Sequence, residues 1–242
     1  MNNDNLTWNW KKVFHIYPYY PTVRHRQRYI LNALNKYNFN SDTFIFDYGL
    51  GDGHLLEILK NKYKLTDQQL GGCDSSSEAV NLASNKIKSS NIFIDCLPTL
   101  NKKANIIICS EVIEHIKDYD QCLKWMSDNL ANNGLLILTT QAGKVHNSDI
   151  YAGHVQHFTL KKLNLILDDL NFNIAKSIYW GFPFFTAQKY LTDFNFNKVQ
   201  NNYLEGKITL RKKIVFKVAY LLYFLHDLIK IGPQIYIIAR RK

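Results

Sequence analysis

A short acidic and glycine-rich segment is the first part of this sequence whose residue types could do chemistry. An apolar run ends at Asp47, and Gly49, Gly51 and Gly53 follow at alternate positions before an apolar helical pattern begins. Alternating glycines let a backbone turn sharply and approach a ligand closely, because no Cβ intervenes. The following helix leaves unpaired N–H groups at its start, above the carboxyl end of the strand. We therefore predict a strand, a tight ligand-binding loop and a helix over residues 44–59.

The acid that opens this loop bears on the kind of ligand. A dinucleotide site has the order G-x-G-x-x-G and places a pyrophosphate on the helix N-terminus. Asp47 would repel a pyrophosphate, whereas it suits a cationic group such as an ammonium or a sulfonium. The spacing therefore favours a cationic ligand over a dinucleotide, and a purely structural glycine turn is the remaining alternative.

A second acid follows the next apolar segment. Asp74 lies about 20 residues beyond the glycine loop, where nucleotide-binding α/β proteins place a carboxylate for ribose hydroxyls. Its spacing from Gly51 favours ribose binding, and capping of the next helix is the alternative role.

A third polar cluster comes directly after a continuous apolar run over 104–109, which is typical of a strand buried on both faces. The cluster contains Ser110, Glu111, Glu114 and His115. If a helix starts at Glu111, then Glu114 and His115 lie on its same face. In open α/β sheets the cleft lies at the carboxyl ends of the strands, so these side chains would point into it.

Together these motifs resemble class I S-adenosylmethionine (SAM)-dependent methyltransferases over roughly Thr22 to Tyr179. The segment from Asp47 to Gly53 is similar to the first motif of that class. The sequence Ser-Glu-Val-x-Glu-His at 110–115 is similar to the fourth motif of the group that includes ubiquinone-biosynthesis O-methyltransferases. The turn over 180–185 looks like methyltransferases found with bacterial surface-polysaccharide genes. The resemblance implies an α/β fold with a Rossmann-like seven-stranded sheet, its last strand antiparallel and helices on both faces. The stretch from Trp180 to Ile231 departs from this minimal fold, because it is too long for a hairpin, and we predict a helical insertion between the final two strands.

The resemblance also implies how the cofactor is held at the strand ends. Asp47 and Asp74 would anchor SAM, and Asp95 would accept from the adenine amino group, although Asp95 could instead form a turn before Pro98. The expected cofactor-binding residues are Asp47, Gly49, Leu50, Gly51, Asp52, Gly53, Asp74, Ser75, Asp95, Cys96, Ser110 and Glu111.

Methyl transfer from a sulfonium is an in-line displacement, and a hydroxyl acceptor also needs a base. His154 and His157 are the first choice because family members often place a histidine in this loop, and His115 is the third; a structural hydrogen bond is the alternative role. Some methyltransferases acting on RNA ends or catechol-like rings bind a divalent metal through a comparable set, here Glu111, Glu114, His115 and His154. Such ligand sets are not selective, so we favour a mechanism without metal.

The basic residues indicate an anionic acceptor. The net charge is +10, and a helix from about Thr22 carries Arg24, His25 and Arg26. We interpret these three residues, with Tyr151, as substrate-binding, although a solvated basic face is the ordinary explanation for such a run. Nucleic acid is not favoured as a partner, because the insertion lacks a basic and aromatic binding module.

The chain length fits one α/β domain with an insertion. Charged residues break the apolar pattern over 211–231 below transmembrane length, which favours a lid or a homodimer contact over a membrane-surface helix. Four scattered cysteines and a polar N-terminus without a signal-peptide core predict a cytoplasmic protein. The predicted parts are an arm and helix (1–40), a SAM-binding core (41–180), a helical insertion or lid (181–232), and a closing strand with a basic tail (233–242).

The resemblance as a whole implies a SAM-dependent O-methyltransferase that releases S-adenosyl-L-homocysteine (SAH). Its acceptor would be a small carbohydrate- or phosphate-linked molecule, as in surface-polysaccharide biosynthesis or phosphoramidate modification. The alternatives are a metal-assisted RNA-end enzyme, a quinone-pathway enzyme, and a degenerate SAM-fold scaffold without activity.

Overall fold

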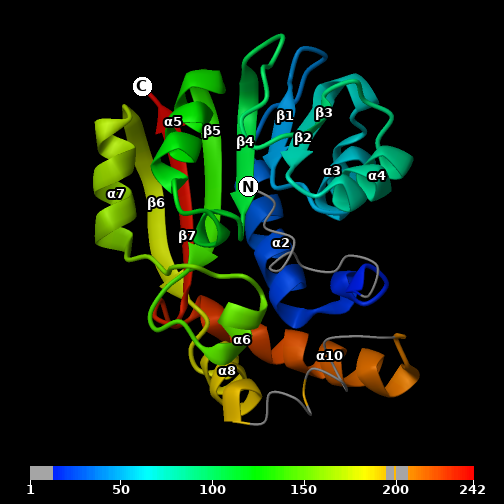
Figure 1. Ribbon diagram of the computed structural model, residues 1–242, viewed down its shortest axis with the longest axis vertical. Helices are drawn as coiled ribbons and strands as arrows, with labels where there is room; N and C mark the ends of the chain where they lie inside the picture. Colours follow the sequence, from blue (N-terminus) through cyan, green and yellow to red (C-terminus); the bar gives the residue numbers. More distant parts are fainter. Residues whose placement is uncertain (1–12, 195–198, 200–206) are drawn as a thin grey trace.

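A computed structural model describes residues 13–194, 199 and 207–242 of the chain. Its centre is a sheet of seven strands in the order β3-β2-β1-β4-β5-β7-β6. β7 runs antiparallel to both of its neighbours, whereas the pairs from β3 to β5 are parallel, so the predicted fold class is confirmed (Figure 1). The strands are β1 (Ile45–Tyr48), β2 (Leu70–Asp74), β3 (Ile92–Ile94), β4 (Ala104–Ser110), β5 (Leu130–Gln141), β6 (Phe172–Trp180) and β7 (Gln234–Arg241).

Helices cover both faces of the sheet (Figure 1). β4 shows why two layers are needed, because Ile107 and Cys109 pack into one core while Ile106 and Ile108 pack into the other. A strand with two buried faces has the continuous apolar sequence seen here. One layer consists of α5 (Tyr119–Asn129) and α7 (Leu160–Asp169), and the other of α2 (Pro21–Leu34), α3 (His54–Tyr63) and α4 (Ser77–Lys86).

The remaining helices are short or belong to the insertion between β6 and β7. Figure 1 shows α6, α8 and α10 gathered at the end of the sheet where β4 and β5 finish. Within the described residues, no helix is long and apolar enough to cross a membrane. These elements are η1 (Tyr17–Tyr19), η2 (Asp67–Gln69), η3 (Ile113–His115), α6 (Asn147–Tyr151), α8 (Phe184–Phe194), α10 (Leu210–Leu222) and η5 (Tyr223–Asp227).

The insertion holds α2 in place against the sheet. Arg28 of α2 donates to Asp227 of η5 with 2.6 Å between Nη1 and Oδ2, and the Tyr29 hydroxyl donates to the same carboxylate at 2.8 Å. From the sheet side, the Tyr236 hydroxyl of β7 donates to the Tyr29 carbonyl at 2.9 Å. α2 is therefore fixed from both sides, which also fixes the side chains that it presents to the cleft.

The strand order creates a cleft at one position. From β1 the chain moves outward to β2 and β3, and it then crosses to β4 on the opposite side of β1. Ligands of open α/β sheets bind where the strand order reverses in this way, beyond the carboxyl ends of the strands. The glycine loop after β1 and the polar cluster after β4 both lie at this position.

Candidate functional site

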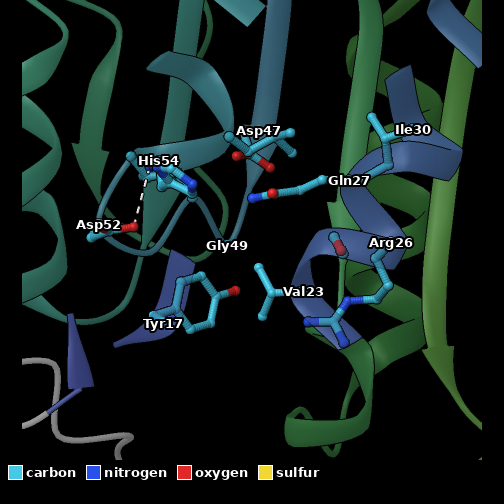
Figure 2. Close-up of a pocket in the computed structure, with 12 residues that line it drawn as sticks. Tyr17, Val23, Arg26, Gln27, Ile30, Asp47, Gly49, Asp52 and His54 are labelled. Atoms are coloured by element: carbon cyan, nitrogen blue, oxygen red, sulfur yellow. Dashed lines mark hydrogen bonds between the residues drawn. The ribbon is translucent and has the colours of Figure 1, made fainter. Parts of the chain in front are cut away.

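A cavity that is open to solvent lies at the carboxyl end of β1, with about 390 Å³ of empty space that includes its open mouth. Figure 2 shows the glycine loop and the start of α3 on one side, α2 on the opposite side, and Tyr17 of η1 between them. The cavity therefore lies where the fold class binds its ligands. Of the predicted cofactor-binding residues, those that line the cavity are Asp47, Gly49, Leu50, Asp52 and Ser110.

The glycine loop has a left-handed backbone, with φ of +78° at Gly49, +54° at Gly51 and +73° at Gly53. At Gly49 a Cβ would also lie 2.3 Å from Cγ2 of Val112, so both sterics and backbone exclude a side chain there. The Gly51 N–H donates to Oδ2 of Asp74 at 3.0 Å. This bond ties the loop after β1 to the end of β2.

Two carboxyl groups give this end of the sheet an acidic character. Asp47 is only 3 % exposed, and burial, with Asp74 and Asp52 nearby, raises its pKa to about 7. Burial also raises the pKa of Asp74. Hydrogen bonds from the N–H groups of Ser76 and Gly51 act in the opposite direction and lower this pKa. A cation beside Asp47 would stabilise its ionised form. The site therefore fits a ligand with an ammonium group at Asp47 and hydroxyl groups near Asp74.

Asp52 and Gly53 also support the loop structurally. Lys86 of α4 donates to Oδ2 of Asp52 at 2.5 Å, and the His54 N–H donates to Oδ1 at 3.2 Å. A Cβ on Gly53 would lie 2.9 Å from the Cβ of Ala83, so glycine lets α3 start close against α4. The two residues hold α3 and α4 together beneath the cavity.

Ser75, Asp95 and Cys96 lie outside the cavity lining and are exposed. β3 pairs with β2 so that Ile94 lies beside Asp74, which puts Asp95 at the next strand end. The Cys96 carbonyl accepts from the Tyr48 hydroxyl at 2.6 Å. The predicted cofactor contacts of these three residues, including the adenine contacts of Asp95 and Cys96, stay predictions.

Of the predicted substrate-binding residues, only Arg26 lines the cavity. The prediction for His25 is wrong, because its ring is fully buried and packs 4.6 Å from the ring of Trp180. Arg24 lies outside the cavity lining, with its guanidinium 4.0 Å from the ring centre of Tyr220 on α10, and its predicted substrate contact stays a prediction. Tyr151 is 45 % exposed at the end of α6, outside the cavity lining. Residues on a helix point in different directions, and only one of the three basic positions faces the cleft.

No helix starts at Glu111, so the condition under which Glu114 and His115 would share a helix face with it is not met. Glu111 has φ of +58°, and only the short η3 follows it. Its carboxylate faces the neighbouring strands, where it accepts from Thr139 at 3.1 Å and from Gln141 at 2.8 Å. Arg26 lies 3.6 Å from the same carboxylate. Glu111 therefore positions Arg26 at the cavity wall.

The loop between β5 and α7 brings three histidines together. Nδ1 of His154 lies 3.0 Å from Nε2 of His157, and the ring centres of His115 and His154 are 4.7 Å apart. The Val155 N–H donates to the Glu114 carbonyl at 2.9 Å, which fixes this loop on η3. Burial, with nearby positive charges, lowers the pKa of His154 to about 2, so its imidazole is neutral near pH 7 and would act as a base only with its imidazolium stabilised by a neighbouring group. The three predicted catalytic histidines thus meet at one place.

Two buried side chains beside these histidines were not predicted. Oδ1 of Asp149 lies 3.8 Å from Nδ1 of His154, and its Oδ2 lies 3.7 Å from Nε2 of His157. Lys189 of α8 donates to Asp149 at 2.9 Å and to Oε1 of Gln141 at 3.1 Å. A polar chain therefore runs from Arg26 and Glu111 to the histidines. Asp149 and Lys189 are far apart in sequence, so only the folded chain shows their pairing.

Tyr17 is a further cavity residue, and the sequence patterns do not single it out because they predict its segment only as part of an N-terminal arm. Burial raises the pKa of its hydroxyl to about 12, with Asp52, Glu111 and Asp47 adding to the rise. Its ring closes one side of the cavity (Figure 2). The high density of aromatic residues before α2 is the sequence feature that could have indicated a contribution of this segment to the cavity.

Three of the four predicted metal ligands lie close together. One ligand atom each from Glu114, His115 and His154 lies within 4.8 Å of the others, whereas Glu111 is not in this group. Oε1 of Glu114 is buried and has no hydrogen-bond partner among the residues that the structure describes. Carboxylate and imidazole groups fit a divalent transition metal. Burial, with Glu111 nearby, raises the pKa of Glu114 well above its usual value, so metal binding would have to displace a proton.

Comparisons with solved structures show the same fold. Phosphoethanolamine N-methyltransferase 2 of Haemonchus contortus, in complex with SAM, matches with TM-score 0.59 and 14 % identity over 92 % of this chain and 53 % of that one. Geranyl diphosphate C-methyltransferase of Streptomyces coelicolor matches with TM-score 0.59 and 9 % identity (90 % and 77 % covered). A SAM-dependent methyltransferase of Archaeoglobus fulgidus matches with TM-score 0.54 and 17 % identity (89 % and 94 % covered). The chain thus spans about half the length of the Haemonchus enzyme.

A comparison with curated proteins gives no match. The family model described as a methyltransferase domain matches residues 22–177, which is more than half of the chain and contains β1 to β5 with the glycine loop and the histidine cluster. The chain belongs to this methyltransferase-domain family.

Proposed function

We propose that this chain is a SAM-dependent methyltransferase that methylates an oxygen atom of a small carbohydrate- or phosphate-linked acceptor. One observation carries the cofactor assignment: a buried acid, Asp47, opens a glycine loop that is itself bound by a second acid, Asp74. SAM would supply an activated methyl group on its sulfonium. Asp47 would bind its ammonium group, Asp74 would bind ribose hydroxyls, and Tyr17 with α2 would exclude water.

The histidine cluster supports a hydroxyl acceptor. Removal of a hydroxyl proton needs a neutral base within hydrogen-bond reach, and burial keeps His154 neutral. His154 would accept the proton, while His157 and Asp149 would orient its ring and the Asp149 carboxylate would stabilise the imidazolium that forms. Lys189 holds Asp149 in position. Acceptor and methyl group must also be held in line, which is the main source of rate for a displacement.

Arg26 supports an anionic acceptor. It is 8 % exposed, lines the cavity and lies 3.6 Å from Glu111. A guanidinium has five N–H donors, so it can contact Glu111 and a phosphate at the same time. A phosphate bound there would set the distance between the acceptor oxygen and the base.

Calorimetry and activity measurements test the proposal in two steps. Purified protein should bind SAH and not NAD; binding of NAD alone would overturn the cofactor, and binding of neither would favour the scaffold without activity. Methyl transfer from radiolabelled SAM is then measured with nucleotide-linked sugars, free sugars and phosphoethanolamine. Transfer to sugar hydroxyls is expected, and transfer only to the amine would overturn O-methylation while leaving the cofactor assignment intact.

A metal-assisted O-methyltransferase is the second proposal, favoured by the unpaired Oε1 of Glu114 beside His115 and His154. A metal there would polarise the acceptor oxygen and lower its pKa. Turnover is measured after chelation and after readdition of Mg²⁺, Mn²⁺ or Zn²⁺. Turnover that is unchanged by the chelator supports the metal-free base, and loss restored by a metal supports this second mechanism.

A further inference from the structure

A row of exposed apolar side chains runs along α10 and η5 to Leu228. The exposed fraction of these side chains ranges from 45 % at Leu225 to 78 % at Leu228. Single exposed apolar side chains are ordinary, whereas a contiguous row marks an interaction site. We call this row the apolar stripe, and its members are Leu210, Ile214, Val218, Leu221, Leu225 and Leu228. Within α10 they recur every three or four residues, as one face of an α-helix does, and Leu225 and Leu228 continue the row through η5 and just beyond it.

The opposite side of α10 is fixed to the protein. Phe216 and Tyr223 are buried, and the Phe216 ring packs 5.6 Å from that of Tyr20. Arg24 of α2 lies over the ring of Tyr220. The apolar stripe is therefore the outward face of a helix whose inward face has its partners in α2 and the arm before it.

Positive charges flank the apolar stripe. Asp227 is the only acid in residues 207–231, and its carboxylate binds Arg28 and Tyr29. Its charge is therefore compensated within the protein. The surface around the stripe is cationic, because the exposed cations of this segment are Lys207, Arg211, Lys213, Lys217 and Lys230.

The charge distinguishes between the possible occupants of this face. A twofold contact between two copies would bring the cationic surface against itself, since both copies use the same patch. An anionic bilayer offers apolar chains to the stripe and negative headgroups to the lysines and arginines. We propose that α10 and η5 dock on an anionic membrane surface, with the helix lying in the plane of the interface and the apolar stripe inserted.

This docking surface is next to the active-site end of the molecule. Figure 1 shows α10 with α6 and α8 at the end of the sheet where β4 and β5 finish. A docked protein would hold its cleft close to the bilayer. The inference goes beyond methyl transfer and does not depend on it, because it rests on the insertion alone.

Vesicle co-sedimentation of the full chain tests the proposal with a matched pair of variants. Leu221 of the stripe and Leu165 of α7 are 58 % and 59 % exposed. The wild type should sediment with phosphatidylcholine vesicles that contain phosphatidylglycerol, and binding should weaken at high salt. Leu221→Glu should reduce binding about tenfold or more, because it removes an inserted side chain and adds a repelled charge, whereas Leu165→Glu should leave it unchanged.

A charge variant and two further measurements complete the test. Lys217→Glu should weaken binding without altering the apolar stripe. Equal binding to neutral and anionic vesicles, or equal loss in both leucine variants, would overturn the proposal. So would a dimer in sedimentation velocity that only Leu221→Glu disrupts, because a second copy would then be the occupant. A drop in Tm for Leu221→Glu far larger than for Leu165→Glu would show that the Leu221 side chain is covered within the chain. This result would also overturn the proposal.

Discussion

At the scale of single residues, Asp47 combines burial with an acidic group at the ligand position. Its pKa of about 7 lies above the usual value for an aspartate, because burial and two neighbouring carboxyl groups oppose its ionisation. An acid whose pKa is raised in the folded protein destabilises the fold as it ionises. This loss of stability develops between the usual pKa near 4 and the folded value near 7. A bound ammonium group would reverse the effect.

Asp47→Asn should therefore separate stability from binding. At about pH 8 the variant should be more stable than the wild type, by an order of 2–4 kcal/mol at most, and the difference should disappear near pH 4. SAH binding by the same variant should be lost. Thermal unfolding at both pH values and calorimetry measure the two effects; a variant that binds SAH normally would remove Asp47 from the cofactor site.

His154→Ala tests the assignment of the base. We expect SAH affinity to be unchanged and turnover to fall about 10²- to 10⁴-fold, since a general base contributes that much. His157→Ala and Asp149→Asn should cause smaller losses, because these residues orient His154 and do not touch the acceptor proton. Single-turnover kinetics with saturating SAM give the chemical step directly. Undiminished turnover in His154→Ala would exclude it as the base.

At the scale of elements, the glycine loop depends on its contact with the segment after β4. Gly49→Ala should destabilise the protein by about 2–4 kcal/mol, because it combines a positive φ with a clash against Val112. Adding Val112→Ala to this variant should recover the part caused by the clash and leave the backbone part. A double-mutant cycle by denaturant unfolding measures the coupling; additive effects would contradict the close contact.

The elements themselves could be predicted because their sequence patterns are local. The buried strand over 104–109 and the glycine loop depend on residue types within a few positions, and both are found as predicted. Glu111 shows where local reasoning fails. Its backbone is left-handed and its carboxylate accepts from Thr139 and Gln141 on β5, partners that no pattern around residue 111 contains. His25 is a second case, because two of the rings that pack around it, those of Trp180 and His226, come from β6 and η5.

At the scale of the whole molecule, the part of the site on the parallel strands could be predicted and the part on other elements could not. Asp47 and Ser110 line the cavity because the fold places strand ends side by side. Asp149, Lys189 and Tyr17 come from a loop, the insertion and the N-terminal arm, whose positions depend on long-range packing. The cleft is therefore completed by the elements that vary most between proteins of one fold.

The N-terminal arm should contribute to ligand affinity more than to the stability of the fold. Tyr17 lies against the cavity, whereas Tyr19 on the same short helix lies 5.2 Å from Nζ of Lys213 on α10. Tyr17→Ala should weaken SAH binding about tenfold, since an aromatic ring that covers a ligand contributes about 1–2 kcal/mol, and it should change Tm little. Tyr19→Ala is the matched control and should leave affinity unchanged. Calorimetry of both variants decides the matter: equal losses would mean that the arm acts only by supporting α2, and loss in neither would mean that the arm leaves the ligand uncovered.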